Sequence, residues 1–403
     1  MTLGSRLGDP YGKDGMTVGR HDGKVLAVIG ASEFQEPLIL KAKELGCTVH
    51  AFAWECGDPG EKSADVFHPI STAERETILG ICREVGVDGV CTIGSDFNNI
   101  TATWIANQMG LPANSDECVR VSTDKKAMRA AFAAGGDPSP RSIPARKGEP
   151  LSSEIRDLAF PVIVKPADRS GSRGITKVED ATGLEDALAA AWGESFGGIA
   201  LVEDFLEGDE FSVEGLSWEG EHRILQITRK FTSGAPSFIE TAHIQPPLLD
   251  AEVVGRIEDV VSHALCTLGV KLGASHAEVK VNEKGEPWIV EIGSRMGGDY
   301  IGSHLVQLST GVDFVGAVVD VALGTKPAID EDARRGASAV RFVLSQNDAD
   351  TLERLRAERP DLVVSGSWES PAGRKVTDSS TRFGHCIMAA DSPEELLSWL
   401  PEL

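Results

Sequence analysis

The most informative part of the sequence is the segment 276–291, which reads HAEVKVNEKGEPWIVE. Two alternating runs flank the Lys-Gly pair at 284–285, and this pattern predicts a β-hairpin with a two-residue turn. The register set by that turn places Glu278 directly opposite Glu291. The other face of the hairpin is then apolar and consists of Ala277, Val279, Val281, Trp288, Val290 and Ile292.

Two carboxylates that face each other across a hairpin, ~5 Å apart, repel and destabilise it. Hard divalent cations such as Mg²⁺ resolve this repulsion because they prefer oxygen ligands. Glu278 and Glu291 are therefore candidate metal ligands. Two other interpretations stay open: a solvated face whose charge is diluted by Lys280 and Arg295, or a register slipped by one residue.

A Gly/Ser-rich loop precedes the hairpin. The apolar strand expected at 161–165 ends in Lys165, and the loop DRSGSRG follows at 168–174. Glycine and serine at this density let backbone N–H groups turn inward around phosphate oxygens, while lysine and arginine supply positive charge. The loop is a candidate phosphate site, although a surface turn has the same composition.

A third segment, LVEDFLEGDE at 201–210, connects an apolar strand to the next strand, expected at 211–216. A hinge between strands can offer backbone N–H and C=O groups to an adenine ring, and a carboxylate can accept hydrogen bonds from ribose hydroxyls. Acidic residues between strands also occur in solvated turns, so both interpretations stay open.

Length and composition limit the class of protein. The chain has 403 residues with 39 Lys+Arg and 62 Asp+Glu, which gives a formal net charge of −23. Such a charge disfavours nucleic-acid and membrane-surface partners, and no apolar run approaches the ~20 residues of a membrane span. Seven scattered cysteines without a C-x-x-C pair are typical of a reducing cytoplasm.

The hydrophobic pattern predicts an α/β protein with several parts. Residues 1–23 are Gly-rich and polar, and we expect a disordered leader there. Residues 24–122 alternate apolar strands with helices, which predicts a small doubly wound domain of three strands that lacks the G-x-G-x-x-G fingerprint. A second block spans 123–330, and a small C-terminal α+β subdomain spans 331–403.

The motifs occur in the order found in the ATP-grasp superfamily, which the chain resembles over about residues 24–330. The resemblance rests on Lys125, Lys165 with its loop, the 203–210 hinge, Glu278, and Glu291-x3-Arg295. It implies the ATP-grasp fold. Residues 24–122 would be the N-terminal pre-ATP-grasp domain. The two lobes of the ATP-grasp domain would be 123–215, with the phosphate loop and adenine hinge, and 216–330, with the metal and substrate groups.

The resemblance also implies roles for single residues. Lys125 and Lys165 would contact the ATP phosphates. The loop would close over the phosphates through Ser170, Gly171, Ser172 and Gly174. Adenine would be held by Glu203 and by the main chain at Phe205 and Leu206, and ribose by Glu210. Glu278 and Glu291 would carry Mg²⁺, with Mn²⁺ as an alternative. Arg295 would lie where an acyl phosphate forms and would contact the substrate.

One position departs from the pattern of many superfamily members, and two further segments point to one branch of the superfamily. Gly293 stands where many members have an asparagine as a further metal ligand. The segments EIGSRMGGD at 291–299 and DSSTRFGH at 378–385 look like the branch of bacterial L-amino-acid ligases. In that branch the loop 230–245 would carry substrate contacts, and its part 231–237 is built like a mobile lid. Lys230 would reach a phosphate, and the catalytic candidates Glu240 and His243 would lie near the substrate. An amino group of the substrate would pair with Glu240 or Asp299, whereas His243 is equally consistent with a buried core residue.

The implied activity is that of an ADP-forming carboxylate–amine ligase. It would form an amide or peptide bond through an acyl phosphate, with an amino acid as one substrate, in a cytoplasmic homodimer. Two alternatives stay open. One is a ligase of the same superfamily that acts on a non-amino-acid carboxylate, as in carbamoyl-phosphate or purine-pathway chemistry. The other is a catalytically silent ATP-binding module.

Overall fold

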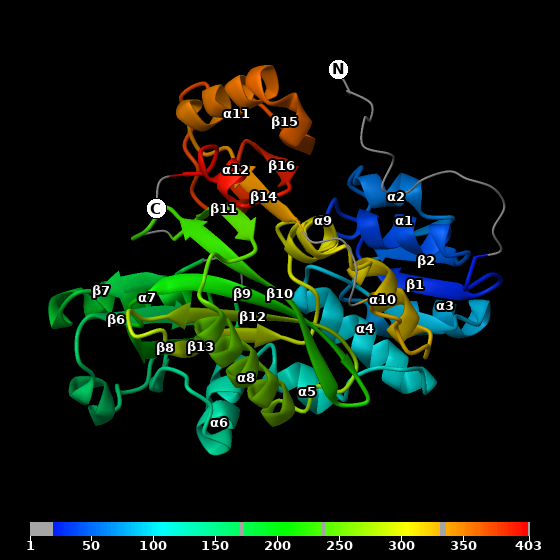
Figure 1. Cartoon of the computed structure of the whole chain (residues 1–403). Helices are drawn as coiled ribbons and strands as arrows, with labels where there is room; N and C mark the ends of the chain where they lie inside the picture. Colours follow the sequence, from blue (N-terminus) through cyan, green and yellow to red (C-terminus); the bar gives the residue numbers. More distant parts are fainter. Residues whose placement is uncertain (1–18, 170–172, 236–237, 331–335, 402–403) are drawn as a thin grey trace.

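The N-terminal domain is a parallel sheet in the order β3-β2-β1-β4 with helices on both faces. The computed structural model describes residues 19–169, 173–235, 238–330 and 336–401 of the chain (Figure 1). The strands of this domain are β1 (Val25–Ile29), β2 (Thr48–Ala53), β3 (Val66–Pro69) and β4 (Gly89–Cys91). Its helices are α1 (Glu36–Glu44), α2 (Pro59–Ser63), α3 (Arg75–Val85), α4 (Asp96–Met109) and α5 (Asp116–Val121).

This arrangement confirms the doubly wound prediction but adds a strand to it. Helix α1 packs on one face of the sheet, and α3 and α4 pack on the other. The additional strand is β3, whose residues are half-buried or exposed at the edge of the sheet. An edge strand of this kind lacks a buried apolar run, so the hydrophobic pattern does not reveal it.

A smaller antiparallel sheet follows, in the order β5-β8-β6-β7, and we call it the small lobe. Helix α7 (Leu184–Glu194) packs against it through an apolar core. Helix α6 (Lys125–Gly135) connects the N-terminal domain to this lobe, and Asp124 caps its first turn. The strands of the small lobe are β5 (Ser142–Arg146), β6 (Val162–Pro166), β7 (Thr176–Val178) and β8 (Ile199–Asp204).

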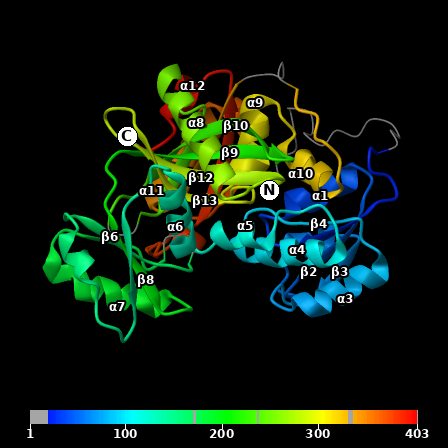
Figure 2. The same cartoon turned by 90° about the horizontal axis from the view of Figure 1, so that it is seen from below.

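The largest sheet has eight strands in the order β13-β12-β9-β10-β11-β14-β16-β15. Its first part consists of β9 (Asp209–Trp218), β10 (Glu221–Thr232), β11 (Glu240–Gln245), β12 (Gly273–Val281) and β13 (Pro287–Gly293). Helix α8 (Ala251–Thr267) packs on this part. The small lobe and the N-terminal domain lie on opposite sides of it (Figure 2). Most of the segment 230–245, expected to be a loop with substrate contacts, lies in the hairpin of β10 and β11, in which Lys230 pairs with His243. The expected lid at 231–237 includes residues 236 and 237, which lie outside the described residues.

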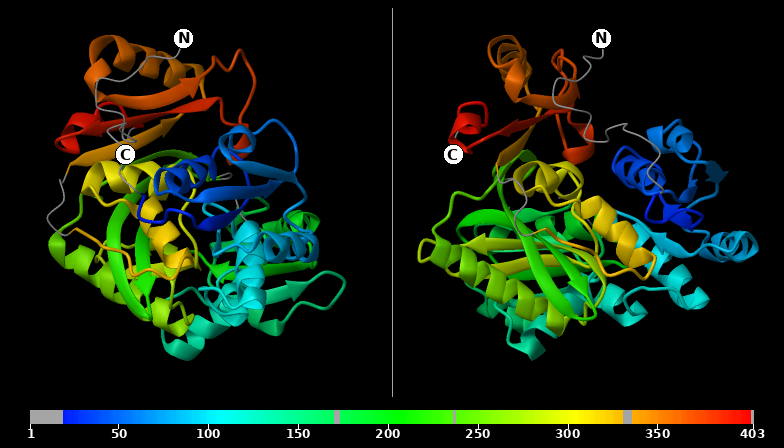
Figure 3. Two further views of the ribbon diagram at one scale, coloured as in Figure 1. Left: turned by 90° about the vertical axis from the view of Figure 1, so that its right-hand side faces the viewer. Right: turned by 45° about the vertical axis from the view of Figure 1, so that its right-hand side comes forward.

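The C-terminal segment continues the same sheet rather than forming a separate one. Strand β14 pairs with β11 and carries the ladder on to β16 and β15. This segment consists of β14 (Ala337–Phe342), α11 (Gln346–Glu358), β15 (Val363–Trp368), β16 (Gly384–Ala390) and α12 (Glu394–Leu397). It projects beyond the rest of the molecule in both views of Figure 3, where it is orange and red.

The predicted hairpin 276–291 exists, but its turn is longer than predicted. Residues 282–286 form the loop, which Asn282 closes by accepting hydrogen bonds from the backbone N–H groups of Lys284 and Glu286. Near the loop the register is offset by one residue from the prediction, so that Val279 pairs with Ile289. A β-bulge then restores the predicted register, and Glu278 faces Glu291.

The bulge also corrects the predicted apolar face. Val290 is the extra residue, so Ile289 and Ile292 both enter the core. Val290 lines a cavity instead, and Trp288 is only half-buried.

Part of the expected leader belongs to the folded N-terminal domain. Residues 1–18 lie outside the described part of the chain, but residues 19–23 form a turn against the N-terminal domain. The buried ring of His21 lies 2.7 Å from Asp320 Oδ1, and Arg20 Nε donates to the same oxygen at 2.9 Å. Asp320 belongs to α10 (Phe314–Ala322), which packs on the N-terminal sheet. The buried carboxylate of Asp320 thus holds residues that composition alone assigns to a disordered tail.

None of the helices in the described ranges is long and apolar enough to cross a bilayer.

Candidate active site

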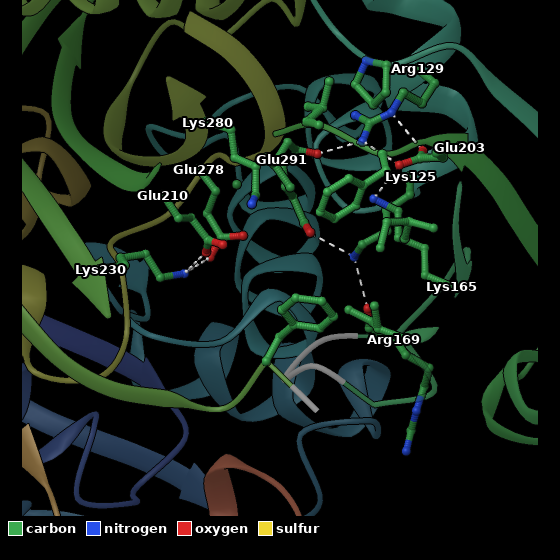
Figure 4. Close-up of a pocket in the computed structure, with 18 of the residues that line it drawn as sticks. Lys125, Arg129, Lys165, Arg169, Glu203, Glu210, Lys230, Glu278, Lys280 and Glu291 are labelled. Atoms are coloured by element: carbon green, nitrogen blue, oxygen red, sulfur yellow. Dashed lines mark hydrogen bonds and ion pairs between the residues drawn. The ribbon is translucent and has the colours of Figure 1, made fainter. Parts of the chain in front are cut away.

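A cavity of about 220 Å³ lies between the small lobe and the large sheet (Figure 4). Strands β6 and β8 line it on one side, and β10, β12 and β13 on the other. It gathers most of the residues that the sequence singled out: Lys125, Lys165, Glu203, Phe205, Leu206, Glu210, Lys230, Glu240, Glu278, Glu291 and Arg295.

A buried triad occupies the end of the cavity next to the small lobe. Glu203 on β8 accepts hydrogen bonds from Arg129 Nε at 2.8 Å and Arg129 Nη2 at 3.1 Å, and Lys165 Nζ lies 2.7 Å from its Oε2. Burial raises the pKa of the Glu203 carboxyl, but the two cations outweigh this and lower it from 4.5 to about 2. Burial lowers the pKa of Lys165, since that lysine shares its single carboxylate with Arg129.

The two facing glutamates each pair with a lysine. Lys230 Nζ lies 2.7 Å from Glu278 Oε1 and 2.8 Å from Glu210 Oε1. Lys125 Nζ donates to Glu291 Oε1 at 2.9 Å. Burial raises the pKa of Glu278, but Lys230 and the neighbouring His276 lower it well below 4.5. The Glu278 carboxylate is therefore ionised, and each of the two glutamates already has a lysine partner within the chain.

Arg295 connects this cavity to the N-terminal domain. Its Nε and Nη2 donate to the two carboxylate oxygens of Asp96, at 2.6 Å and 2.9 Å. Asp96 is the first residue of α4, directly after β4, and sequence reasoning did not single it out. A signal was present, because polar residues after a parallel strand lie at the carboxyl edge of the sheet, where ligands bind.

A second pair that the sequence analysis missed lies beneath the loop that carries Arg295. The buried side chain of Glu214 on β9 contacts His276 Nδ1 and accepts a hydrogen bond from the Gly297 N–H at 3.1 Å. Burial lowers the pKa of His276, but Glu214 outweighs this effect and raises it from 6.5 to about 9. The two residues are cross-strand neighbours, so only the strand order would have revealed them.

The cavity is electrically balanced rather than basic. Among the described residues that line it, seven carboxylates face seven lysine and arginine side chains. Over the whole chain the acidic residues exceed the basic ones, 62 to 39. The fold therefore concentrates cations here, and the carboxylates that line the same cavity balance them in number.

Some predicted residues lie outside this cavity. His243 is buried and packs edge-on against Phe342, with ring centroids 5.6 Å apart, as a core histidine would. Asp299 forms a bidentate ion pair with Arg382 instead of facing the cavity. Gly174 does not line this cavity, and Ser170, Gly171 and Ser172 lie outside the described residues.

The candidate metal ligands are Glu278 and Glu291. They are cross-strand partners, and both line the cavity. Within the described ranges, no group of three or more His, Cys, Asp and Glu side chains is arranged to hold a metal ion. Two carboxylates suit Mg²⁺, which keeps several waters and substrate phosphates in its shell.

The geometry agrees with comparisons to known proteins. The family model described as "ATP-grasp domain" matches residues 158–303. Alanine–anticapsin ligase of Bacillus subtilis is 25% identical over 275 residues, which cover 63% of this chain and 57% of that protein. D-Alanine–D-alanine ligase of a Polaromonas species is 25% identical over 348 residues, which cover 81% of this chain and 96% of that protein.

A solved structure shows the same architecture over almost the whole chain. The L-amino acid ligase from Bacillus licheniformis superposes with a TM-score of 0.78 and 23% sequence identity, covering 94% of this chain and 96% of that one. The chain spans less than three fifths of the length of the first curated relatives it matches. The ATP-grasp domain model thus matches residues 158–303, and the chain as a whole has the ATP-grasp fold.

Proposed function

We propose that the chain is an ATP-dependent carboxylate–amine ligase that joins an acyl group to an amine and releases ADP and phosphate. An amino acid would be one of its substrates. The observation that carries this proposal is the Glu278–Glu291 pair, held by Lys230 and Lys125 in one cavity with Arg295. Alanine–anticapsin ligase and L-amino acid ligase, among the proteins it resembles, support the amide-forming reaction by their names.

The nucleotide would lie along the small lobe. Phe205 and Leu206 line the cavity beside the Glu203 triad and would bracket the adenine, with Glu210 near the ribose. Lys125 and Lys165 would contact the phosphates, because both ammonium groups lie in the same cavity. Glu278 and Glu291 would hold Mg²⁺, which supplies charge neutralisation and alignment of the phosphate oxygens when it is bound.

In the first step an oxygen of the substrate carboxylate attacks the γ-phosphorus of ATP. The bond from that phosphorus to the β–γ bridging oxygen breaks, and ADP leaves. Both reactants are anions, so the chain must hold cations at the point of attack. Arg295 is suited to this because its guanidinium is kept in a fixed orientation by Asp96.

In the second step the amine nitrogen attacks the acyl carbon and forms the C–N bond. The bond from that carbon to the phosphate oxygen breaks, and phosphate leaves with the electron pair. Arg295 would stabilise the oxyanion that forms between these events. Glu240 is the carboxylate in the cavity best placed to receive the amine proton, because its Oε2 is held by Ser379 Oγ at 2.5 Å.

The test measures release of ADP and phosphate from Mg-ATP in the presence of pooled L-amino acids. We expect release by the unaltered chain that depends on the pool. Substitution Glu291→Gln should reduce it about a hundredfold or more, since it removes one of the two carboxylates proposed to hold the metal. Splitting the pool would identify both substrates.

The matched control is Glu283→Gln, which changes an exposed glutamate in the loop of the same hairpin. Its activity should equal that of the unaltered chain. ATP binding without any amino-acid-dependent release would contradict the amino-acid ligase and direct the search to other carboxylates. Absence of ATP binding would contradict the whole proposal.

A further inference from the structure

A second cavity of about 380 Å³ adjoins the first. Its walls come from four parts of the chain: the loop after β1 with Phe34, Arg173 before β7, the turn at Asp299 and Tyr300, and the C-terminal segment around Ser379 and Arg382. The two cavities share a wall, because Ser379 lines the second one and donates a hydrogen bond to Glu240 in the first. Its volume lies in the range of pockets that bind small molecules.

Among the described residues, five charged side chains of both signs line this second cavity: Glu33, Arg173, Asp299, Asp378 and Arg382. Asp299 and Arg382 form a pair. Arg382 Nη1 donates to Asp299 Oδ2 at 2.9 Å, and Nη2 donates to Asp299 Oδ1 at 2.5 Å. Its Nε donates to the Ser379 carbonyl at 2.7 Å. Each Nη carries two N–H groups, so the pair retains donors and acceptor lone pairs for a ligand. No lysine lies among the described residues of this wall. Positive and negative groups side by side suit a zwitterion better than a polyanion.

Aromatic rings form another part of the wall. Tyr300 stacks on His385 with ring centroids 4.0 Å apart, and Phe34 lies 5.7 Å from Tyr300. Burial lowers the pKa of His385 to about 4, so this ring is a neutral plane at physiological pH. Half-buried Phe34 and His385 leave ring surface for a ligand. Such a wall favours a flat side chain, which would stack on it or meet it edge to face.

The backbone is strained at this wall. Asp299 and Tyr300 have backbone φ values of +49° and +65°, which residues other than glycine rarely adopt. A π-helical turn, Ile301–Leu305, follows them directly. Strained residues and π turns cluster at functional sites. Here the strain holds the Asp299 carboxylate against Arg382 and the Tyr300 ring against His385, although neither residue lines the first cavity.

We propose that the second cavity binds the amine substrate, and that this substrate is an α-amino acid with a planar ring in its side chain. Asp299 follows Arg295 by four residues on the same loop, whereas Arg382 comes from the C-terminal segment. The amino end would therefore point toward Arg295 and the acyl phosphate, and the carboxylate would pair with Arg382. The side chain would lie on Phe34 and His385. This inference rests on the proposed ligase function and names its amine partner.

The first test is calorimetric binding of L-phenylalanine and L-alanine to the full chain, with and without a non-hydrolysable ATP analogue and Mg²⁺. We expect tighter binding of L-phenylalanine. Substitution Phe34→Ala should weaken that binding about threefold to tenfold and leave L-alanine binding unchanged. The control is Trp54→Ala, which removes an aromatic side chain, 71% exposed, that does not line either cavity. Equal affinities for the two amino acids, equal effects of the two variants, or no binding would overturn the inference.

The second test identifies the product by mass spectrometry, with L-alanine and L-phenylalanine supplied together. We expect phenylalanine to be acylated on its nitrogen, so that it forms the carboxyl-terminal residue. Substitution Arg382→Lys should raise the KM for phenylalanine about tenfold without changing the KM for ATP, because lysine cannot form the bidentate pair. A purely structural role would change both constants. Phenylalanine at the amino-terminal position would overturn the inference.

These tests separate the two proposals. If phenylalanine binds and Phe34→Ala weakens it, but no ADP is released, the ligase function fails and the cavity assignment stands. If ADP is released with small amino acids alone, the ligase function stands and the cavity assignment fails.

Discussion

At the scale of single residues, the most consequential contact is the one between Glu203 and its two cations. The sequence analysis assigned Glu203 to adenine and Lys165 to phosphate, as separate roles. In the structure they form one buried triad with Arg129, whose Nη2 also donates to the Val290 carbonyl at 2.7 Å. The triad thereby connects helix α6, strand β8 and the β13 bulge at the nucleotide end of the cavity.

Arg129 is the residue to change in order to test this connection. Substitution Arg129→Met should lower the free energy of unfolding by about 3–5 kcal/mol, because it leaves a buried carboxylate with one cation fewer. Urea denaturation measures the change. The control Arg120→Met breaks an exposed pair with Glu117 and should cost far less, because water screens that pair. Equal losses in the two variants would show that the triad contributes no more than a surface pair.

The candidate site was predictable where its residues lie in local motifs. Glu278, Glu291 and Lys165 follow from strand patterns and loop composition within a few residues. Arg129, Asp96 and Glu214 could not be found that way, since each acquires its role from a partner far along the chain. Asp299 was singled out, but its pairing with Arg382 depends on how the C-terminal segment folds back.

At the scale of elements, the hairpin shows how a correct pairing can follow from two errors that cancel. The predicted two-residue turn was wrong, since the loop spans residues 282–286 and shifts the register by one. The bulge at Val290 was also unforeseen, and it shifts the register back. A bulge leaves no signal in the alternation of apolar residues. The pairing of Glu278 with Glu291 was therefore predicted correctly, but without the bulge that produces it.

The connection from β8 to β9 depends on a glycine. Gly208 has a φ of +121°, and a Cβ there would lie 2.1 Å from the Val281 carbonyl oxygen on β12. Substitution Gly208→Ala should destabilise the chain by more than about 1 kcal/mol and weaken ATP binding at the neighbouring hinge. Gly220 also has a positive φ, +86°, but nothing lies within 4 Å of its Cβ position.

Gly220→Ala therefore measures the loss of stability caused by the positive φ alone. The additional loss in Gly208→Ala is due to the close approach of the Val281 carbonyl oxygen. Thermal unfolding and ATP titration of the two variants provide the comparison. If both alanine variants behave alike, the approach of Val281 does not constrain the hinge.

At the scale of the whole molecule, folding stability should depend on pH through buried histidines. Burial lowers the pKa of His304 and of His385 from 6.5 to about 4. Between these values the unfolded chain binds more protons than the folded chain. The stability from each histidine is thus fully present above pH 6.5 and is lost as the pH falls toward 4, by up to about 3 kcal/mol. The Glu203 contribution is lost at lower pH, between 4.5 and about 2.

Thermal unfolding across that range tests this expectation. The variant His304→Gln should lose less stability than the unaltered chain between pH 6.5 and pH 4. The control His263→Gln changes a histidine whose side chain is 62% exposed and should leave the pH profile unchanged. A profile that is flat across this range in the unaltered chain would contradict the burial argument.

The overall division of the chain was more predictable than its connections. The doubly wound N-terminal domain follows from apolar strands alternating with helices. The pairing of β11 with β14 does not, because it joins strands separated by several helices and turns. The contact between Asp320 and residues 19–23 was equally unpredictable, since composition does not show that a buried carboxylate lies beside this Gly-rich segment.

The way in which the C-terminal segment joins the sheet has an evolutionary consequence. It attaches through one ladder, β11 to β14, yet it delivers Ser379 and Arg382 to the second cavity. The groups proposed for phosphate chemistry all precede it in the chain. The part of the pocket that carries Ser379 and Arg382 can therefore diverge on its own, while Phe34, Asp299 and the groups proposed for phosphate chemistry are inherited unchanged. Chimeras joined just before β14 would exchange that one wall of the pocket and leave the rest of the pocket in place.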